Sequence, residues 1–278
     1  MSKLFNKSFL TRTISAFMLV VAILTTTILG EDLCFVTIYA VAMIGLAEMY
    51  KVVEINANKL GLFGYLATTI YYVLIRFSGD EYISVFIIGY LLLLMALYVF
   101  SFPAYKTEQI LMAFFGVIYV SILMSFIYMV RIGESGIYTV WLIFICAWGC
   151  DTFAYLTGVT LGKHKLAPIL SPKKSIEGAI GGVVGAAAVG GGYGYFVQSK
   201  VVGISDTVLV FAIIGGVGAL ISMIGDLAAS AIKRNYDIKD YGKLIPGHGG
   251  VLDRFDSILF TAPIVYFFLK FLGTQYIN

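Results

Sequence analysis

Nine long apolar segments, separated by short polar connections, constrain the fold of this chain more than any other feature of its sequence. A helix needs about 20 mostly apolar residues to cross the hydrocarbon core of a bilayer. The apolar runs are continuous and lack the alternation of barrel strands. With 60% hydrophobic residues, the 278-residue chain is also more apolar than a soluble domain. We therefore predict an all-α, polytopic integral membrane protein with about nine transmembrane helices. The predicted spans are Thr13–Leu29, Leu33–Tyr50, Leu60–Ile75, Tyr82–Phe102, Ile110–Val130, Gly136–Leu156, Ala179–Val197, Thr207–Ile232 and Phe255–Leu272.

The distribution of Lys and Arg predicts the orientation of these spans. If the N-terminus is inside, 15 of the 19 cations face the cytoplasm, and the four on the other side are Arg76, Arg131, Lys200 and Lys270. Because positively charged connections stay in the cytoplasm, we predict a cytoplasmic N-terminus and an external C-terminus. The N-terminal cations and the apolar run after them also resemble a signal peptide. No small-residue cleavage site follows before Glu31, so we keep this run as the first span.

The two halves of the chain differ in character. Residues 1–135 consist mostly of five spans with short connections and few polar groups that suggest chemistry. Residues 136–278 contain four spans joined by polar loops on the predicted cytoplasmic side. We predict that the second region is the catalytic one.

Two residue types within the spans are interpreted as structural. Cys34, Cys146 and Cys150 all lie inside predicted spans, which favours small buried hydrophobic residues over a disulfide framework. Tyr71, Tyr72, Tyr98 and Tyr105 lie near span ends and fit an aromatic belt at the membrane interface.

Two carboxylates lie inside predicted spans, where an ionisable group costs several kcal/mol unless it is paired or hydrated. Asp151 lies about one turn from the inner end of the sixth span, and we favour a functional role for it. Glu48 lies close to the cytoplasmic end of the second span. For Glu48 we favour an interfacial side chain over a functional one.

The densest group of charged residues lies between Ser230 and Asp256. Its cations suit phosphate oxygens, its carboxylates suit a divalent metal ion, and its glycines let the backbone approach a ligand closely. Asp226, Ser230 and Lys233 are spaced by four and three residues, so a helix presents them in one stripe. This arrangement indicates a nucleotide and phosphate site at a membrane surface.

Further acidic residues follow at the start of the ninth span. Asp253 and Asp256 are three residues apart and share a helix face. Carboxylates from two helix ends, brought together, hold a Mg²⁺ ion that bridges nucleotide phosphates. Asp240 is either part of this site or a solvated loop residue. His248 is too isolated for a zinc site, which leaves a phosphate contact, a proton role or loop structure.

The connection before the seventh span is a second polar segment. It contains Gly162-Lys163-His164-Lys165 and the run from Ser171 through Lys173, Lys174 and Ser175 to Glu177. Two cations and hydroxyls just before a helix start suit an anion, because free backbone N–H groups also point there. The alternative is a positive loop that only sets topology.

Glycine is frequent in the seventh and eighth spans. Glycines at a spacing of four allow close helix packing in lipid, and we prefer this interpretation to ligand contact. The glycines concerned are Gly178, Gly181, Gly182, Gly185, Gly190, Gly191, Gly192, Gly194, Gly215, Gly216, Gly218 and Gly225.

These polar segments together resemble a known signature. The residues are Ser230-x-Ile232-Lys233-Arg234, Lys239-Asp240-x-Gly242 and Pro246-x-His248-Gly249-Gly250-Val251-x-Asp253-Arg254-Phe255-Asp256. They look like the signature of phosphatidate cytidylyltransferases, also called CDP-diacylglycerol synthases. The upstream segments Asp151-Thr152-Phe153-Ala154-Tyr155 and Ser171-Pro172-Lys173-Lys174-Ser175 are similar to other polar segments of that family. Two positions depart from the family pattern. Many relatives have Asn or another polar residue in place of Cys150, and Phe is common in place of Leu161.

The resemblance implies a multi-helix enzyme of the inner or plasma membrane that makes CDP-diacylglycerol and pyrophosphate from CTP and phosphatidic acid. It also implies Mg²⁺, with a second cation left open, and a homodimer. We expect no nucleic acid partner. For the metal we expect Asp226 and Asp253 as ligands, with Asp256 next.

The other expected roles concern the substrates. Lys233, Arg234 and Arg254 would hold phosphates, while Ser230 and His248 would orient them. A second phosphate contact would come from Ser171, Lys173, Lys174 and Ser175, with Asp151 and Glu177 fixing these cations or binding metal. The remaining expected substrate-binding residues are Lys239, Asp240, Gly249 and Gly250.

Three rival functions stay open at this point. Two are enzymes: a CTP-dependent lipid kinase and a cytidylyltransferase for another lipid phosphate. The third is a transporter, because buried charges and glycine-broken helices also occur at transport sites. The charges gather near one predicted membrane face and no inverted repeat is visible, which disfavours a transporter.

Overall fold

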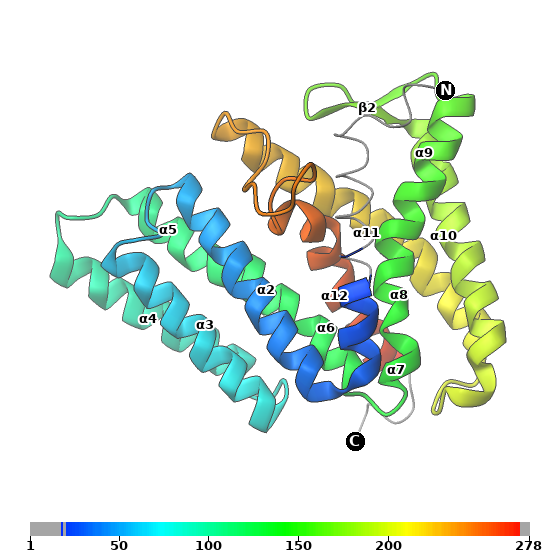
Figure 1. Ribbon diagram of the computed structural model, residues 1–278, viewed down its shortest axis with the longest axis horizontal. Coiled ribbons are helices and arrows are strands. Elements are labelled where there is room, and N and C mark those ends of the chain that lie inside the picture. Colours follow the sequence, from blue (N-terminus) through cyan, green and yellow to red (C-terminus); the bar gives the residue numbers. More distant parts are fainter. Residues whose placement is uncertain (1–17, 19–20, 273–278) are drawn as a thin grey trace. The chain divides into compact units, whose positions relative to one another are not determined.

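The computed structural model describes Met18 and residues 21–272, and this part of the chain is mostly helical (Figure 1). The elements, in order, are α2 (Glu31–Val52), α3 (Lys59–Ser78), α4 (Ile83–Ser101), α5 (Thr107–Gly116), the π-helix η1 (Val117–Ile122), α6 (Leu123–Arg131), α7 (Gly136–Thr139), α8 (Trp141–Phe144), the π-helix η2 (Ile145–Gly149), α9 (Cys150–Leu161), β1 (Lys165–Ala167), β2 (Ser171–Ser175), α10 (Ile176–Val197), the 3₁₀-helix η3 (Gln198–Lys200), α11 (Thr207–Asn235) and α12 (Leu252–Leu272).

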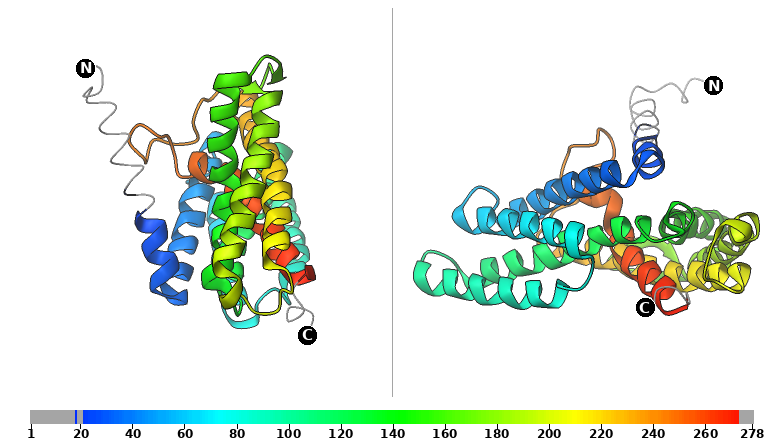
Figure 2. Two further views of the ribbon diagram at one scale, coloured as in Figure 1. Left: turned by 90° about the vertical axis from the view of Figure 1, so that its right-hand side faces the viewer. Right: turned by 90° about the horizontal axis from the view of Figure 1, so that it is seen from below.

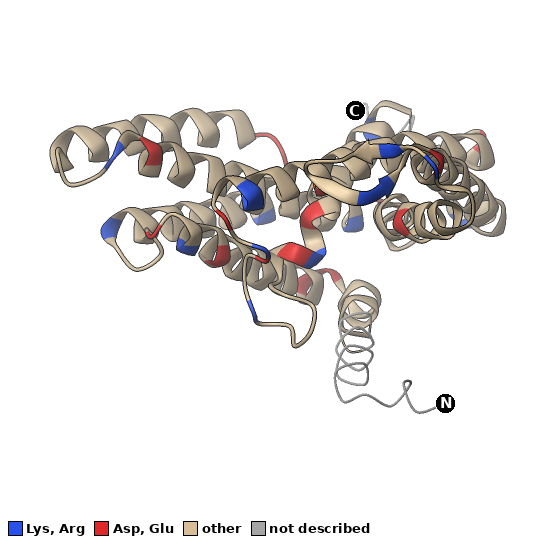
Figure 3. Cartoon of the chain, turned by 90° about the horizontal axis from the view of Figure 1, so that it is seen from above, with Lys and Arg blue, Asp and Glu red and all other residues tan. Residues whose placement is uncertain are grey.

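Within the described residues, eight helices are long and apolar enough to cross a membrane. They correspond to the second through ninth predicted spans, with continuous helices over Thr107–Arg131 and Gly136–Leu161. The predicted first span, Thr13–Leu29, begins outside the described residues. The protein is therefore a multi-pass membrane protein. Figure 3 shows long stretches of helix without a charged residue, as a hydrocarbon environment requires.

The described chain forms two compact units. The first contains Asp32–Ser125 and Asp240–Asp253, with the described part of the segment up to Thr26. The second contains Thr27–Glu31, Phe126–Lys239 and the chain from Arg254 onward. The division predicted after residue 135 separates a catalytic region from the helices before it. It does not concern compact units, and it stays a prediction.

Tyrosine hydroxyls stabilise the core of the first unit. Tyr71 is fully buried, and its hydroxyl lies 2.8 Å from that of Ser125. Tyr72 is also buried, and it donates to the carbonyl of Ser121 at 3.2 Å. The predicted aromatic belt is therefore wrong for these two residues. They lie near a helix end, as expected, but on the face that packs against the π-helix η1 and the residues after it.

Glycine packing organises the second unit, in which α10 lies beside α9 and α11 (Figures 1 and 2). A side chain at Gly190 would collide with the carbonyl of Phe211, and one at Gly215 with the carbonyl of Ala186. The backbones of α10 and α11 are therefore in direct contact, which confirms the predicted packing role of Gly190 and Gly215. Gly192, from the same predicted set, faces open space. Cys146 and Cys150 are buried and free, as predicted.

A small antiparallel hairpin connects α9 to α10. Strands β1 and β2 pair Lys165 with Ser175 and Ala167 with Ser171. The all-α prediction thus needs one correction, since a two-stranded sheet stands where a loop was expected. Strands this short contain too few residues to give a recognisable alternation of polar and apolar positions. The hairpin holds the Ser-Pro-Lys-Lys segment in extended form directly before α10.

Candidate active site

Six charged side chains interact in the second unit. The ammonium group of Lys174, on β2, forms an ion pair with the carboxylate of Asp226, on α11. Asp151, on α9, interacts electrostatically with Lys174, Asp226 and Arg254. Asp256, on α12, interacts in the same way with Asp226, Lys233 and Arg254. The structure therefore brings together six residues that the sequence predicts as site residues from four separate elements.

Five of these charged side chains are buried or half-buried, whereas Asp151 is exposed. Asp256 is only 8% exposed and accepts a 2.8 Å hydrogen bond from the backbone N–H of Ser257. The side chains of Lys174 and Asp226 are 23% and 28% exposed. Among the described residues, the buried Nε of Arg254 has no hydrogen-bond partner. A buried guanidinium N–H without a partner is costly, and an anionic ligand would satisfy it.

A cavity of about 370 Å³ adjoins this cluster in the second unit. Asp151, Lys173, Lys174 and Ser175 supply its polar lining. Most of the remaining lining is apolar and comes from Ala154, Tyr155, Val159, Leu166, Ala179 and Met223. The cavity is therefore amphipathic, with charge at one part and hydrocarbon at another. Such a lining suits a ligand that joins a phosphate to an apolar body.

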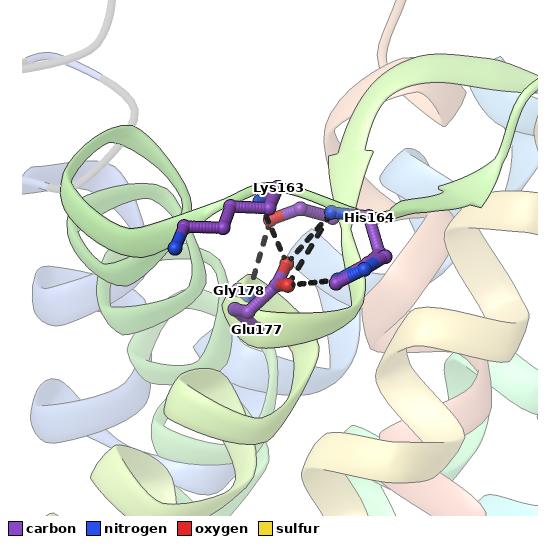
Figure 4. A network of polar contacts seen from close by, with 5 residues as sticks. Lys163, His164, Glu177 and Gly178 are labelled. Atoms are coloured by element: carbon purple, nitrogen blue, oxygen red, sulfur yellow. Dashed lines mark hydrogen bonds and ion pairs between the residues drawn. The ribbon is translucent and has the colours of Figure 1, made fainter.

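The Glu177 side chain forms hydrogen bonds with the residues that lead into the hairpin, and we call this contact the Glu177 clasp (Figure 4). Its carboxylate accepts hydrogen bonds from the backbone N–H groups of Lys163 at 3.0 Å and His164 at 3.2 Å. The Nδ1 atom of His164 lies 2.6 Å from the same carboxylate. Ser175 caps α10 by accepting a 3.1 Å hydrogen bond from the N–H of Gly178. These contacts give Glu177 and Ser175 structural roles, and their contact with substrate stays a prediction.

In the first unit, Asp253 organises the glycine-rich segment that precedes it. The carboxylate is 5% exposed, and its Oδ2 accepts hydrogen bonds from the N–H groups of Tyr241 at 2.8 Å and Gly250 at 2.9 Å. Gly249 has a φ of +89°, a conformation that favours glycine, and its carbonyl accepts a hydrogen bond from the N–H of Ile245. The segment is therefore a closed turn built around the Asp253 carboxylate.

Glu48 belongs to this arrangement, and its predicted interfacial role is wrong. It is 5% exposed and accepts hydrogen bonds from the N–H groups of Val251 at 3.1 Å and Leu252 at 2.9 Å. The sequence places Glu48 near a span end, but it carries no sign of a partner more than 200 residues away. Its isolation as a carboxylate in an apolar span was the one available signal.

The remaining predicted residues lie in or beside the connection from α11 to α12. Lys233 and Arg234 occupy the last turn of α11, and Ser230 is half-buried one turn earlier. Lys239 and Asp240 are exposed, and the backbone N–H of His248 donates to the carbonyl of Ile245 at 2.9 Å. Ser171 begins β2. Asp226 and Asp253 belong to different units, so their predicted approach stays a prediction.

The chain is similar to members of one known protein family. A family model described as "Cytidylyltransferase family" matches residues 10–272. The phosphatidate cytidylyltransferase of Staphylococcus haemolyticus (strain JCSC1435) is 29% identical over 259 residues, which cover 91% of this chain and 96% of the relative. The protein of that name from Bacillus subtilis (strain 168) is 32% identical over 253 residues, 87% of this chain and 90% of the relative. The one from Synechocystis sp. is 42% identical over 138 residues, 50% of this chain and 45% of the relative.

Proposed function

This chain belongs to the cytidylyltransferase family, and we propose that it transfers CMP from CTP to phosphatidic acid, giving CDP-diacylglycerol and pyrophosphate. One observation in the structure carries the proposal most directly. The Lys174–Asp226 ion pair lies in a cluster of three carboxylates and three cations beside an amphipathic cavity. A membrane enzyme that joins a nucleotide to a lipid phosphate needs this combination.

The reaction joins two polyanions. An oxygen of the lipid phosphate forms a bond to the α-phosphorus of CTP, the bond from that phosphorus to the β-phosphate oxygen breaks, and pyrophosphate leaves. The attacking phosphate is already anionic near neutral pH, so no separate general base is needed. Neutralisation of charge and positioning therefore supply most of the catalysis. Lys174, Lys233 and Arg254 are the cations of the cluster that serve this purpose.

The carboxylates fit a Mg²⁺ ion. Asp226 and Asp256 interact electrostatically in the second unit and offer the hard oxygen ligands that Mg²⁺ prefers. Within the described residues, no three acidic, His or Cys side chains gather closely enough to enclose a metal ion. Mg²⁺ usually binds through one or two carboxylates together with substrate phosphates and water, so a pair is sufficient. We propose Asp226 and Asp256 as this pair, and bound Mg²⁺ would offset charge on the phosphates. Asp253, the other expected ligand, stays a prediction.

The cavity in the second unit is proposed to receive the lipid phosphate. Lys173 is exposed at its rim, and Lys174 and Ser175 line its polar part. Tyr155 and Val159, on α9, give the cavity an apolar wall. This helix is the last part of the candidate membrane span Gly136–Leu161. The unsatisfied Nε of Arg254 adds a donor for a phosphate oxygen. Ser230, Arg234, Lys239, Asp240 and His248 are proposed to complete the contacts to CTP.

We further propose that this site faces the cytoplasm, where CTP is made. The first polar connection in the second unit, between α9 and α10, contains Lys163, Lys165, Lys173 and Lys174, and the connection after α11 is also rich in cations. The opposite connections carry few, which supports a cytoplasmic N-terminus and an external C-terminus after a ninth span. A homodimer is proposed from the family resemblance alone, and light scattering of the purified protein tests it.

The position of a radioactive label tests the proposed reaction. Purified protein is incubated with phosphatidic acid, Mg²⁺ and CTP labelled at either the α- or the γ-phosphate. We expect α-label, and no γ-label, to appear in the lipid phase as CDP-diacylglycerol. Transfer of γ-label instead would identify a lipid kinase. Absence of both labels from the lipid would contradict the proposal, and lipid flux across vesicles without CTP consumption would indicate a transporter.

A further inference from the structure

Glu48 connects the N-terminal helices to the glycine-rich segment that contains the family signature. Its carboxylate lies near the end of α2 and bridges to the N–H groups of Val251 and Leu252, where α12 begins. We infer that Glu48 is a positioning residue for the transferase reaction, an inference that rests on the proposed function. It would act by fixing the segment Asp240–Asp253, and through it Asp253, without touching substrate itself.

The contacts of Glu48 satisfy a specific need of this segment. The first N–H groups of an α-helix have no partner within the helix, and a carboxylate at this end is also favoured by the helix dipole. Glu48 serves two of these groups at once, one with each carboxylate oxygen. At 5% exposure it has little access to water, so the backbone donors are what make its burial tolerable. The carboxylate and the helix end therefore depend on each other.

Two glycines of the segment are shaped around this carboxylate. A Cβ atom at Gly250 would lie 2.5 Å from both oxygens of Glu48, and one at Gly242 would also collide with the Glu48 side chain. Neither glycine has a positive φ, so backbone conformation does not require glycine at either position. Room for Glu48 is the physical reason for glycine here.

Gly250 transmits the position of Glu48 to Asp253. Its N–H donates to Oδ2 of Asp253 at 2.9 Å, while its Cα side faces Glu48. The second donor to Oδ2 is Tyr241, which adjoins Gly242. The carboxylates of Glu48 and Asp253 thus both accept hydrogen bonds from the backbone of the same glycine-rich turn. Without Glu48, the N–H groups of Val251 and Leu252 lose their hydrogen-bond partners. The turn that positions the Asp253 carboxylate is then held less firmly.

Hydrogen exchange measured by mass spectrometry tests this clasp in the full-length protein in detergent micelles. We compare Glu48→Ala, Glu48→Gln and the control Glu54→Gln, which changes an exposed carboxylate six residues away. Glu48→Ala is expected to exchange faster in peptides covering residues 240–253, with peptides of α3 unchanged. Glu48→Gln keeps one acceptor oxygen and is expected to be intermediate. Glu54→Gln is expected to match the wild type.

Kinetics on the same samples test the positioning role. We expect Glu48→Ala to lower kcat about 10- to 100-fold, as removal of residues that orient ligands commonly does, and Glu48→Gln to restore part of the loss. The KM for phosphatidic acid should stay within about twofold, because we propose that this substrate binds in the cavity of the second unit. Unchanged exchange in residues 240–253, or faster exchange with unchanged kcat, would overturn the inference.

A double-mutant cycle keeps the test independent of folding yield. Gly250→Ala in the wild type should lower kcat, because the added methyl group displaces the Glu48 carboxylate. In the Glu48→Ala background the same change should have little further effect. Additive losses would contradict the proposed contact. If the wild type makes no CDP-lipid at all, the proposed function fails, while the exchange experiment still decides whether Glu48 holds the segment.

Discussion

The ammonium group of Lys174 pairs with the carboxylate of Asp226, so the hairpin strand β2 is joined to α11 at the predicted catalytic cluster. Lys174 comes from the Ser-Pro-Lys-Lys segment and Asp226 from the stripe before the signature, two motifs that are 52 residues apart in the sequence. The pair is partly shielded from water and has Asp151 as a further charged neighbour. These two motifs therefore form one site rather than two.

Replacement of Asp226 is expected to abolish most activity. Asp226→Asn removes the charge that we assign to Mg²⁺ and to Lys174 while keeping the shape of the side chain. By analogy with the loss of one electrostatic catalytic group, we expect product formation to fall about 100-fold or more, measured as α-label in the lipid phase. Asp206→Asn is the matched control, because Asp206 caps the other end of α11 and Asn caps equally well. Retained activity in folded Asp226→Asn protein would refute the metal assignment.

Filling the cavity is expected to weaken lipid binding selectively. Val159 lines the cavity, whereas Leu156 is exposed on the same helix and does not. We expect Val159→Trp to raise the KM for phosphatidic acid about tenfold, the scale of a lost apolar contact of roughly 1.4 kcal/mol, with the KM for CTP unchanged. Leu156→Trp should leave both constants near wild type. A rise in the KM for CTP instead would assign the cavity to the nucleotide.

Two glycines of α10 distinguish a role in helix packing from a role in backbone flexibility. A side chain at Gly190 would meet the backbone carbonyl of Phe211, whereas no atom lies within 4 Å of a Cβ placed at Gly192. We expect Gly190→Val to destabilise the protein by about 1–3 kcal/mol, the usual cost of overpacking, and Gly192→Val to have little effect. Thermal unfolding in detergent, followed by circular dichroism, measures the difference. Equal melting temperatures for the two variants would show that α10 and α11 can separate at no cost.

The Glu177 clasp is expected to protect the hairpin from proteolysis. Glu177→Ala removes the acceptor shared by the N–H groups of Lys163 and His164. Trypsin should then cleave faster after Lys163, Lys165 and Lys173, which limited digestion and mass spectrometry can resolve. Glu134→Ala changes an exposed carboxylate in another connection and should leave cleavage at these sites unchanged. Identical digestion of the Glu177→Ala variant and the wild type would contradict the structural role assigned to Glu177.

Much of the helical architecture could be predicted from the sequence, because each span is a local property of about 20 residues. The glycine contacts between α10 and α11 were also predictable, since small residues at a spacing of four have one main use in lipid-embedded helices. The signature residues around Asp226 and Asp253 were found in the same way, through unusual charge in an apolar chain.

Long-range partners could not be predicted. The burial of Tyr71 depends on which face of α3 meets Ser125, and the hydrophobicity of a span that is apolar all round does not reveal its faces. The role of Glu48 depends on backbone N–H groups more than 200 residues later, and backbone groups leave no trace in the sequence. The hairpin was missed because its strands are too short for periodicity to appear.

Helix α11 has 29 residues, so it is about 43 Å long at 1.5 Å per residue, against about 30 Å for the hydrocarbon core. Measured from Thr207, Asp226 stands about 29 Å along the axis, a distance close to the thickness of that core. The final turns, with Ser230, Lys233 and Arg234, lie beyond Asp226 and account for the length of the helix that exceeds the core. We therefore expect the rate to depend on bilayer thickness, because shorter or longer acyl chains would shift the lipid phosphates relative to Asp226.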